Sequence, residues 1–143
     1  MGFKIYNVDN APHIKDLSYG GKPFVSFTTN GAFHISKRAI QLLHAKLGSK
    51  VVFLQDEQYP KDWYIRKEKP GENGFELDNR GKNIYGFKSS SLADIIAKSS
   101  LEGMAFGQVR FWLSVSKEGL LQLDVRHPVI ASPQLYNRKP VNK

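Results

Sequence analysis

The stretch from Phe24 to Leu47, FVSFTTNGAFHISKRAIQLLHAKL, decides the fold expected for this chain. Asn30-Gly31 separates two runs in which apolar and polar residues alternate. This dipeptide favours the tight turn of a β-hairpin, because that turn needs positive φ angles. A helix is predicted directly after the second run, with Ser36 as its N-cap and Gly48 just beyond its end. The stretch therefore predicts two antiparallel strands that lead into an amphipathic helix.

A two-residue loop at this turn sets which side chains share a face of the hairpin. It would place Phe27 directly opposite His34, and cross-strand partners lie on the same face. Phe33 and Ile35 would then lie on the other face, with the apolar side of the helix. We therefore expect Phe27 and His34 to point away from the core.

The rest of the chain predicts further strands and one more helix. A second helix is expected to begin near Ser91, with Asp94 in a position typical of a capping box. The order β-β-α-β-β-β-β-α-β-β predicts an α+β fold, with antiparallel β-sheets and two helices on one side. The further strands are predicted at residues 50–56, 63–67, 75–78, 84–88, 108–115 and 120–126.

The two strand–helix segments resemble each other at a fixed spacing. A shift of 52 residues places the apolar positions of the first on those of the second. Two units of the type β-β-β-β-α would explain this match if the first unit had lost or borrowed two strands. Two unrelated strand–helix segments are the alternative. The matched pairs are Phe33 with Tyr85, Ile35 with Phe87, Ile40 with Leu92, and Leu43 with Ile95.

The composition predicts one domain with two flanking segments. The chain has 143 residues, 41% of them hydrophobic, and no cysteine. We expect an N-terminal arm at 1–23, the α+β domain at 24–126 and an extended basic tail at 127–143, where prolines disfavour regular structure. The absence of cysteine is compatible with a reducing cytoplasm, where we expect the protein to act. No run of eighteen apolar residues occurs, so no membrane association is expected.

The charge favours an anionic partner. The net charge is +8 and the pI is about 9.7. Between Leu17 and Gln55 the chain contains no acidic residue but five lysines and arginines. Nucleic acid is the commonest partner of such a basic domain, and solubility with chance clustering is the alternative explanation.

The junction Gly31-Ala32-Phe33-His34-Ile35-Ser36, where a strand enters a helix, resembles one in two known families. The single-stranded-DNA-binding domain of transcriptional positive cofactor four has a curved four-stranded sheet that leads into one helix, and the Whirly family resembles its duplication. The resemblance covers residues 24–126 as topology and implies single-strand binding. At the level of residues it is confined to the junctions, so no binding residue of either family is transferred to this chain.

Strand alternation identifies aromatic and basic residues that should face away from the core. In the segment 108–115 one face is wholly apolar, which leaves Arg110 and Trp112 on the other. The segment WYIRK likewise presents Tyr64 and Arg66 on one face. Single-strand binding needs aromatic rings for stacking on bases and cations for phosphates. A second sheet or a dimer partner that buries these rings is the alternative.

These patterns give a set of candidate nucleic-acid-binding residues. The set contains aromatic residues and a histidine that are expected to point outward, together with lysines and arginines of strands and turns that could contact phosphates. The predicted residues are Phe27, His34, Tyr64, Arg66, Lys67, Arg80, Lys82, Lys88, Arg110 and Trp112.

No pattern supports catalysis. The four histidines are scattered without metal-ligand spacing, and no phosphate-binding glycine loop or nucleophile elbow occurs. We therefore expect no enzyme activity, no metal and no cofactor.

The predicted function is largely sequence-independent binding of single-stranded nucleic acid, with DNA as the first choice, in replication, recombination or transcription, by a homo-oligomer. One alternative is a structural or protein-interaction module of a phage or mobile element that self-assembles through its sheets. The other is a duplex-DNA-binding transcriptional regulator, because AFHISKRAIQLLHAKLGSKVVFL resembles strand–helix–strand pieces of swapped-hairpin repressors.

Overall fold

The structure, a computed structural model, describes residues 22–131, which form ten strands and two helices. The α+β class is as predicted, and both helices and the eight predicted strands occur in the predicted order. Two strands are additional: Phe75–Glu76 and Asp78–Gly81 replace the single strand predicted at 75–78, and Val129–Ala131 follows the last predicted strand. No helix in this part of the chain has the length and apolar character needed to cross a membrane. The elements are β1 (Phe24–Thr28), β2 (Ala32–Ser36), α1 (Lys37–Leu42), β3 (Lys50–Gln55), β4 (Trp63–Lys67), β5 (Phe75–Glu76), β6 (Asp78–Gly81), β7 (Ile84–Lys88), α2 (Ser90–Ser100), β8 (Gln108–Lys117), β9 (Leu120–Leu123) and β10 (Val129–Ala131).

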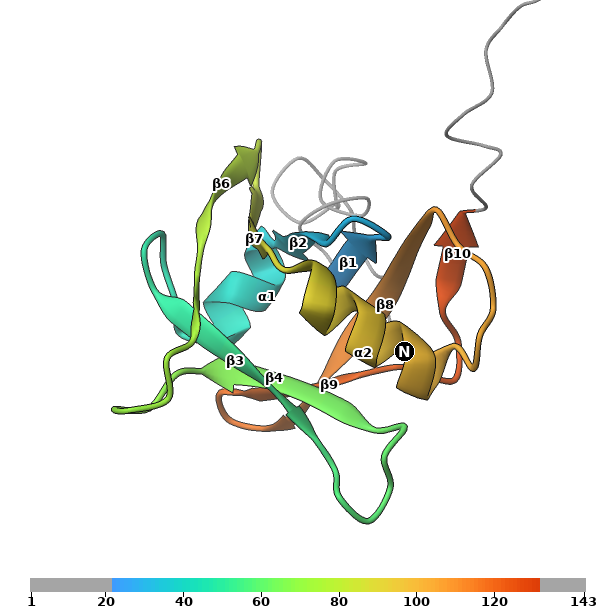
Figure 1. The fold of residues 1–143 in the computed structure, drawn as a ribbon. Helices are drawn as coiled ribbons and strands as arrows, with labels where there is room; N and C mark the ends of the chain where they lie inside the picture. Colours follow the sequence, from blue (N-terminus) through green and yellow to red (C-terminus); the bar gives the residue numbers. More distant parts are fainter. Residues whose placement is uncertain (1–21, 132–143) are drawn as a thin grey trace, which may run out of the picture.

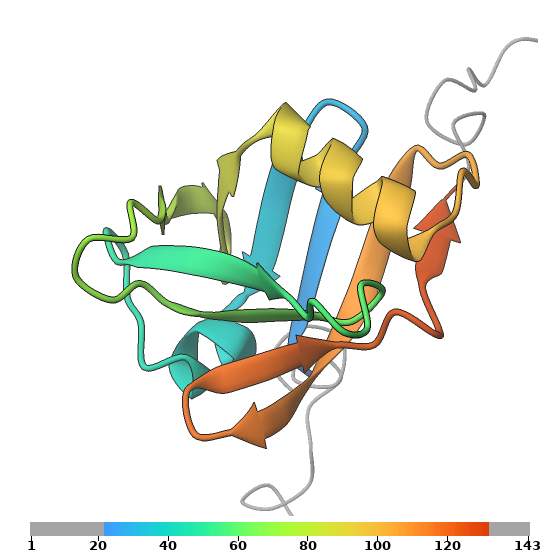
Figure 2. The same cartoon turned by 60° about the horizontal axis from the view of Figure 1, so that its bottom comes forward.

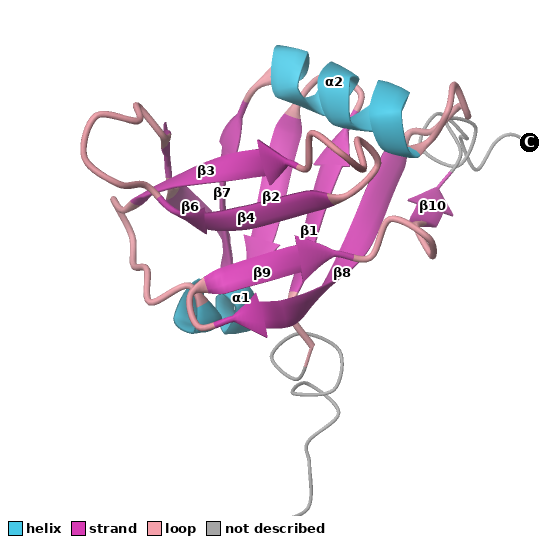
Figure 3. Cartoon of the chain, turned by 90° about the horizontal axis from the view of Figure 1, so that it is seen from below, coloured by secondary structure: helices cyan, strands magenta, loops and turns pink. Residues whose placement is uncertain are grey.

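The strands form one antiparallel sheet that nearly closes into a barrel. Its order is β5-β3-β4-β9-β8-β1-β2-β7-β6, and β10 pairs with β8. The strands at the two ends of this order, β5 and β6, are consecutive in the chain and separated only by the buried Leu77. In Figure 3, β3, β4 and β9 cross over β2, β1 and β8. The helices lie at opposite ends of the strands rather than on one side (Figures 1 and 2).

Stacked phenylalanines fill the barrel where its two ends meet. The ring of Phe87 in β7 lies between Phe33 and Phe75, with ring centroids 4.7 and 4.6 Å apart. Phe27 lies 4.9 Å from Phe33 on the other side. Because Phe75 belongs to one end of the sheet and Phe87 lies next to the other, this stack joins the ends through apolar packing.

The first hairpin has a longer turn than predicted, and this corrects the expected faces. Gly31 has a φ angle of 91°, and its N–H donates to the carbonyl of Thr28 at 3.0 Å. Phe27 therefore lies opposite Phe33, not opposite His34. A register shift of one residue exchanges the two faces of a strand. Phe27 is only 1% exposed and belongs to the core, so its prediction as an outward binding residue was wrong.

Each helix begins at the turn of the other hairpin. The N–H of Ser89, the N-cap of α2, donates to the carbonyl of Gly31 at 2.8 Å. Reciprocally, the N–H of Lys37 at the start of α1 donates to the carbonyl of Asn83 at 3.0 Å. A Cβ atom at Gly31 would overlap the backbone of Ser89 and Ser90, so glycine is required here for space as well as for its φ angle.

The two hairpins β1–β2 and β6–β7 pair with the same spacing. Phe27 lies opposite Phe33 and Asn79 opposite Tyr85, so that 27 to 79 and 33 to 85 are both steps of 52. Between the hairpins His34 lies opposite Gly86, again a step of 52. The pairing pattern of the first hairpin therefore recurs 52 residues later, as far as the register shift between Asn79 and Gly81.

Several element boundaries differ from those predicted. Helix α1 ends at its C-cap Leu43, where His44 has a φ angle of 59°, and does not continue to Gly48. Helix α2 is capped by Ser89, whose Oγ accepts from the N–H of Leu92, and not by Ser91. Regular structure also continues past residue 127, because β10 pairs with β8. The rest of the predicted tail and nearly all of the arm lie outside the described residues.

Candidate nucleic-acid interface

One row of outward positions crosses six strands of the barrel, and we call it the outer row. It contains two of the predicted residues, Arg110 and His34, which are separated only by Ser26 on β1. Ser26 is buried and receives a hydrogen bond from the amide of Gln108 at 3.4 Å. The outer row runs through Val129, Arg110, Ser26, His34, Gly86 and Asp78.

Beside the outer row lies a cation–aromatic cluster made of Lys22, Phe24, Arg110 and Trp112. The guanidinium carbon of Arg110 is 4.0 Å from the ring centroid of Phe24 and 5.6 Å from that of Trp112. The ammonium of Lys22 is 5.2 Å from the Trp112 centroid, and the rings of Phe24 and Trp112 meet edge to face at 6.2 Å. The pairing of β1 with β8, which places Phe24 opposite Trp112, assembles this cluster.

The cluster holds two positive charges in defined places. A guanidinium that lies on an aromatic ring keeps its N–H donors free at the edge. Among the described residues no carboxylate forms an ion pair with Arg110 or Lys22. Phe24 is 3% exposed beneath Arg110 and cannot stack on a ligand, whereas Trp112 is half-buried and keeps part of its surface accessible.

His34 and Arg80 lie close together but add little net charge. Burial, together with the nearby Arg80, lowers the pKa of the His34 imidazole, so it is neutral at pH 7. Arg80 forms an ion pair with Asp78, with Nε 2.6 Å from Oδ1. Gly86 leaves room for the side chain of Arg80. A Cβ atom at residue 86 would crowd the Arg80 side chain and would overlap the carbonyl oxygen of Phe33. The neutral imidazole of His34 can therefore donate one hydrogen bond and accept another.

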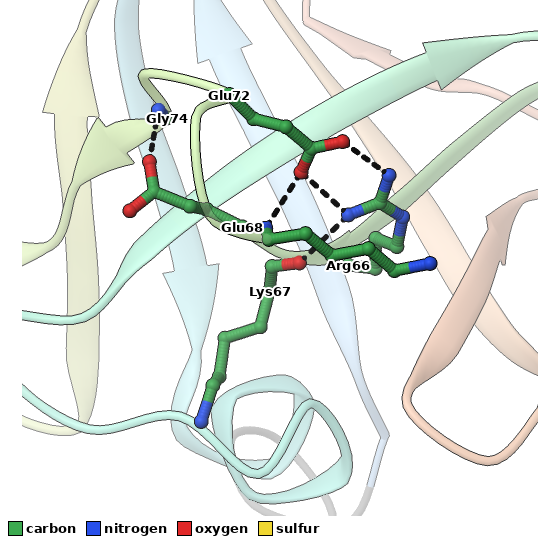
Figure 4. A network of polar contacts seen from close by, with 6 residues as sticks. Arg66, Lys67, Glu68, Glu72 and Gly74 are labelled. Carbon is green, nitrogen blue, oxygen red and sulfur yellow. Dashed lines mark hydrogen bonds and ion pairs between the residues drawn. The ribbon is translucent and has the colours of Figure 1, made fainter.

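Tyr64 and Arg66 lie on the outer side of β4, as predicted, but Arg66 already has a partner. Its Nη1 and Nη2 atoms contact the Oε1 and Oε2 atoms of Glu72 at 2.8 and 2.7 Å (Figure 4). The hydrogen bonds from Arg66, and next that from the N–H of Lys69, lower the pKa of Glu72 to about 2. Arg66 thus fastens the loop at 68–74 to β4, and its charge is not free for a phosphate.

The three predicted lysines have different surroundings. Lys67 donates from Nζ to the carbonyl of His44 at 3.1 Å, just after α1. Lys82, in the turn before β7, and Lys88, opposite Ala32, are exposed and form no ion pair with any described residue. Lys82 and Lys88 therefore remain available as phosphate contacts, whereas Lys67 contributes to holding α1 against β4.

The predicted residues do not form one surface. Arg110, Trp112 and His34 come together on β8 and β2, with β1 between them. Tyr64 and Arg66 lie two strands away from β8, on the far side of β9. The three aromatic–cation combinations expected from the sequence are therefore reduced to one, the pair on β8.

Sequence reasoning missed Lys22 and Phe24. Lys22 falls in the segment interpreted as an arm, and Phe24 reads as an ordinary apolar strand residue. Only the pairing of β1 with β8 brings them to Trp112, and no local pattern predicts which strands pair. The one signal in the sequence was a basic residue, Lys22, two positions before the first predicted strand.

Comparison of the chain with protein-family models, curated proteins and solved structures finds no match in any of the three. Within residues 22–131 no group of three or more histidine, aspartate or glutamate side chains is placed to hold a metal ion.

Proposed function

We propose that this protein binds single-stranded nucleic acid through the outer surface of β8, β1, β2 and β7. The cation–aromatic cluster is the observation that carries the proposal. It places a half-buried tryptophan between two cations that no described carboxylate neutralises. A base stacked on an aromatic ring and phosphates beside fixed cations are the two contacts that such binding requires.

The distribution of unpaired cations supports a path across this surface. Lys22 and Arg110 lie at the β8 side, and Lys82 and Lys88 lie at opposite ends of β7. None of the four forms an ion pair with a described residue. A strand that crosses from β8 to β7 would meet cations at both sides and the neutral His34 between them.

A second candidate is duplex-DNA binding, and the recurrence of the hairpin pairing after 52 residues favours it. We infer that the chain consists of two β-β-α-β-β units, 24–67 and 78–123. The shared hairpin spacing and the reciprocal bonds at the helix starts support this duplication. A protein with two-fold symmetry matches a palindromic duplex.

The two halves differ in charge, and this places duplex binding second. At the start of α1 lie Lys37 and Arg38, whereas α2 begins with Ser89, Ser90 and Ser91. A symmetric duplex complex would use corresponding cations from both halves. The unequal helix starts fit a single strand crossing one surface better than a palindrome.

Fluorescence anisotropy with an oligo-dT strand and a matched duplex, over a series of salt concentrations, tests the proposal. A single-strand binder retains the dT strand with a negative salt slope and loses affinity when Trp112 is replaced by alanine. The variant Ile95→Ala, on the exposed face of α2, is the matched control. Preference for the duplex would support the second candidate. Binding to neither probe, with elution as a discrete oligomer, would overturn both in favour of a self-assembling module.

A further inference from the structure

A polar hollow of about 310 Å³ adjoins Trp112 on the outer side of the barrel. A second hollow of about 560 Å³ shares Asp62, Val125 and Arg126 with it and continues toward Tyr59. Both volumes fall within the range of ligand-binding clefts. We call the first one the Asp62 hollow, and its walls come from β8, β9, the segment after β9 and the turn before β4.

The walls of the Asp62 hollow offer four different groups. Trp112 supplies an aromatic ring, Gln122 an amide, Asp62 a carboxylate and Arg126 a guanidinium. No described group donates a hydrogen bond to the Asp62 side chain or pairs with it, although the residue is half-buried. Asp124, the other carboxylate in the lining, differs because its oxygens contact Nδ1 of His127 at 3.1 and 3.2 Å.

A carboxylate can only accept hydrogen bonds, and this property restricts which base it can bind. Guanine has two adjacent donors on one edge, the N1–H and the N2 amino group, which match the two carboxylate oxygens. Adenine and cytosine present an amino group beside an acceptor nitrogen, and thymine presents a single N–H between two carbonyl groups. Those acceptors would face the negative charge of Asp62 and weaken binding.

We propose that the Asp62 hollow binds one guanine base of a strand held on the cation–aromatic cluster. The base stacks against Trp112, its N1–H and N2 amino groups donate to Asp62, and the Gln122 amide contacts its remaining polar edge. Arg126, exposed where the two hollows meet, binds the adjoining phosphate. This inference rests on the proposed single-strand binding and adds a base preference to it.

The test compares three oligonucleotides that differ at one position. Oligo-dT, the same strand with one central guanine, and the same strand with inosine in place of guanine are titrated in anisotropy experiments. We expect the guanine strand to bind about tenfold more tightly than oligo-dT. Inosine lacks the N2 amino group and should lose most of that gain.

Variants assign the preference to Asp62. Asp62→Asn should no longer distinguish guanine from thymine, and it should bind oligo-dT more tightly than the native protein because the charge that repels the thymine carbonyl groups is removed. Asp94→Asn, on the exposed side of α2, is the matched control and should keep the preference. A guanine preference that persists in Asp62→Asn would show that the Asp62 carboxylate is not the group that distinguishes guanine from thymine.

The outcomes separate this inference from the proposed function. Equal affinity of the native protein for all three strands would overturn the guanine site and leave single-strand binding intact. Absence of binding to every strand would overturn both. Because the comparison of guanine with inosine uses the native protein, the inference stays testable even if the Asp62 variant does not fold.

Discussion

The outer sides of β8 and β4 carry the same combination of residues and use it differently. Each has an arginine and an aromatic residue two positions apart, Arg110 with Trp112 and Tyr64 with Arg66. Arg110 lies over the ring of Phe24, without an ion pair in the described part of the chain. Arg66 is bound at two points by Glu72. Strand alternation therefore predicts where a side chain points, whereas its partners decide whether it is available to a ligand.

The largest expected effect is on the free energy of unfolding, and it distinguishes aromatic residues inside the barrel from those on its outer side. Phe27→Ala removes a ring that is packed between Phe33 and Phe111, so it should lower the free energy of unfolding by about 3–5 kcal/mol. Tyr64→Ala, on the outer side of β4, should cost about 1 kcal/mol or less. Urea unfolding of both variants measures the difference. Equal losses would contradict the inward direction of Phe27.

The next effect concerns binding of a strand. Trp112→Ala should weaken oligo-dT binding by about 1–3 kcal/mol, since a stacking surface is lost. Tyr64→Ala should change the affinity much less, because Tyr64 lies on β4 with no unpaired cation on its strand face. Anisotropy titrations at one salt concentration compare the two variants. A larger loss for Tyr64 would move the interface to β4.

Salt dependence sharpens the comparison of the two arginines. If Arg110 contacts a phosphate, Arg110→Gln should reduce the slope of log K against log salt by about 0.7 for a single strand. Arg66→Gln should leave the slope unchanged, because Glu72 already compensates its charge. The slopes are measured by titration at several salt concentrations. Equal changes for both variants would contradict the distinction between a free and a paired guanidinium.

The smallest effect concerns the loop at 68–74. The pKa of Glu72 is lowered to about 2, so the ion pair with Arg66 stabilises the fold above the ordinary carboxylate pKa of about 4.3. This stabilisation is lost as the pH falls toward 2. Glu72→Gln should release the loop at pH 7, with faster amide exchange there and unchanged exchange in β4. Unchanged loop exchange would show that other contacts hold the loop.

The sequence predicted the elements well where their local signals were strong. The strands 63–67 and 84–88 have the predicted bounds, because alternation and flanking turns mark them clearly. The hairpin register was wrong because Asn30-Gly31 suits a two-residue loop, whereas Gly31 takes part in a three-residue one. One additional loop residue exchanges the faces, and Phe27 moved from the predicted site into the core.

The candidate site was less predictable than the fold. The outward direction of Arg110 and Trp112 follows from alternation within a single strand. The partners of Arg110, Arg66 and Trp112 depend on strand pairing and on a loop conformation, which no short pattern encodes. Long-range contacts decided which predicted cations stay unpaired.

The reciprocal hydrogen bonds at the two helix starts have a consequence for how the chain folds. The carbonyl groups of Gly31 and Asn83 each complete a helix start in the other half of the molecule. These bonds, and the pairing of β1 with β8 and of β2 with β7, join segments that lie far apart in the sequence, and such non-local pairing makes folding slow. A chain cut in the loop at 68–74 would yield two fragments that must assemble with each other before either becomes ordered.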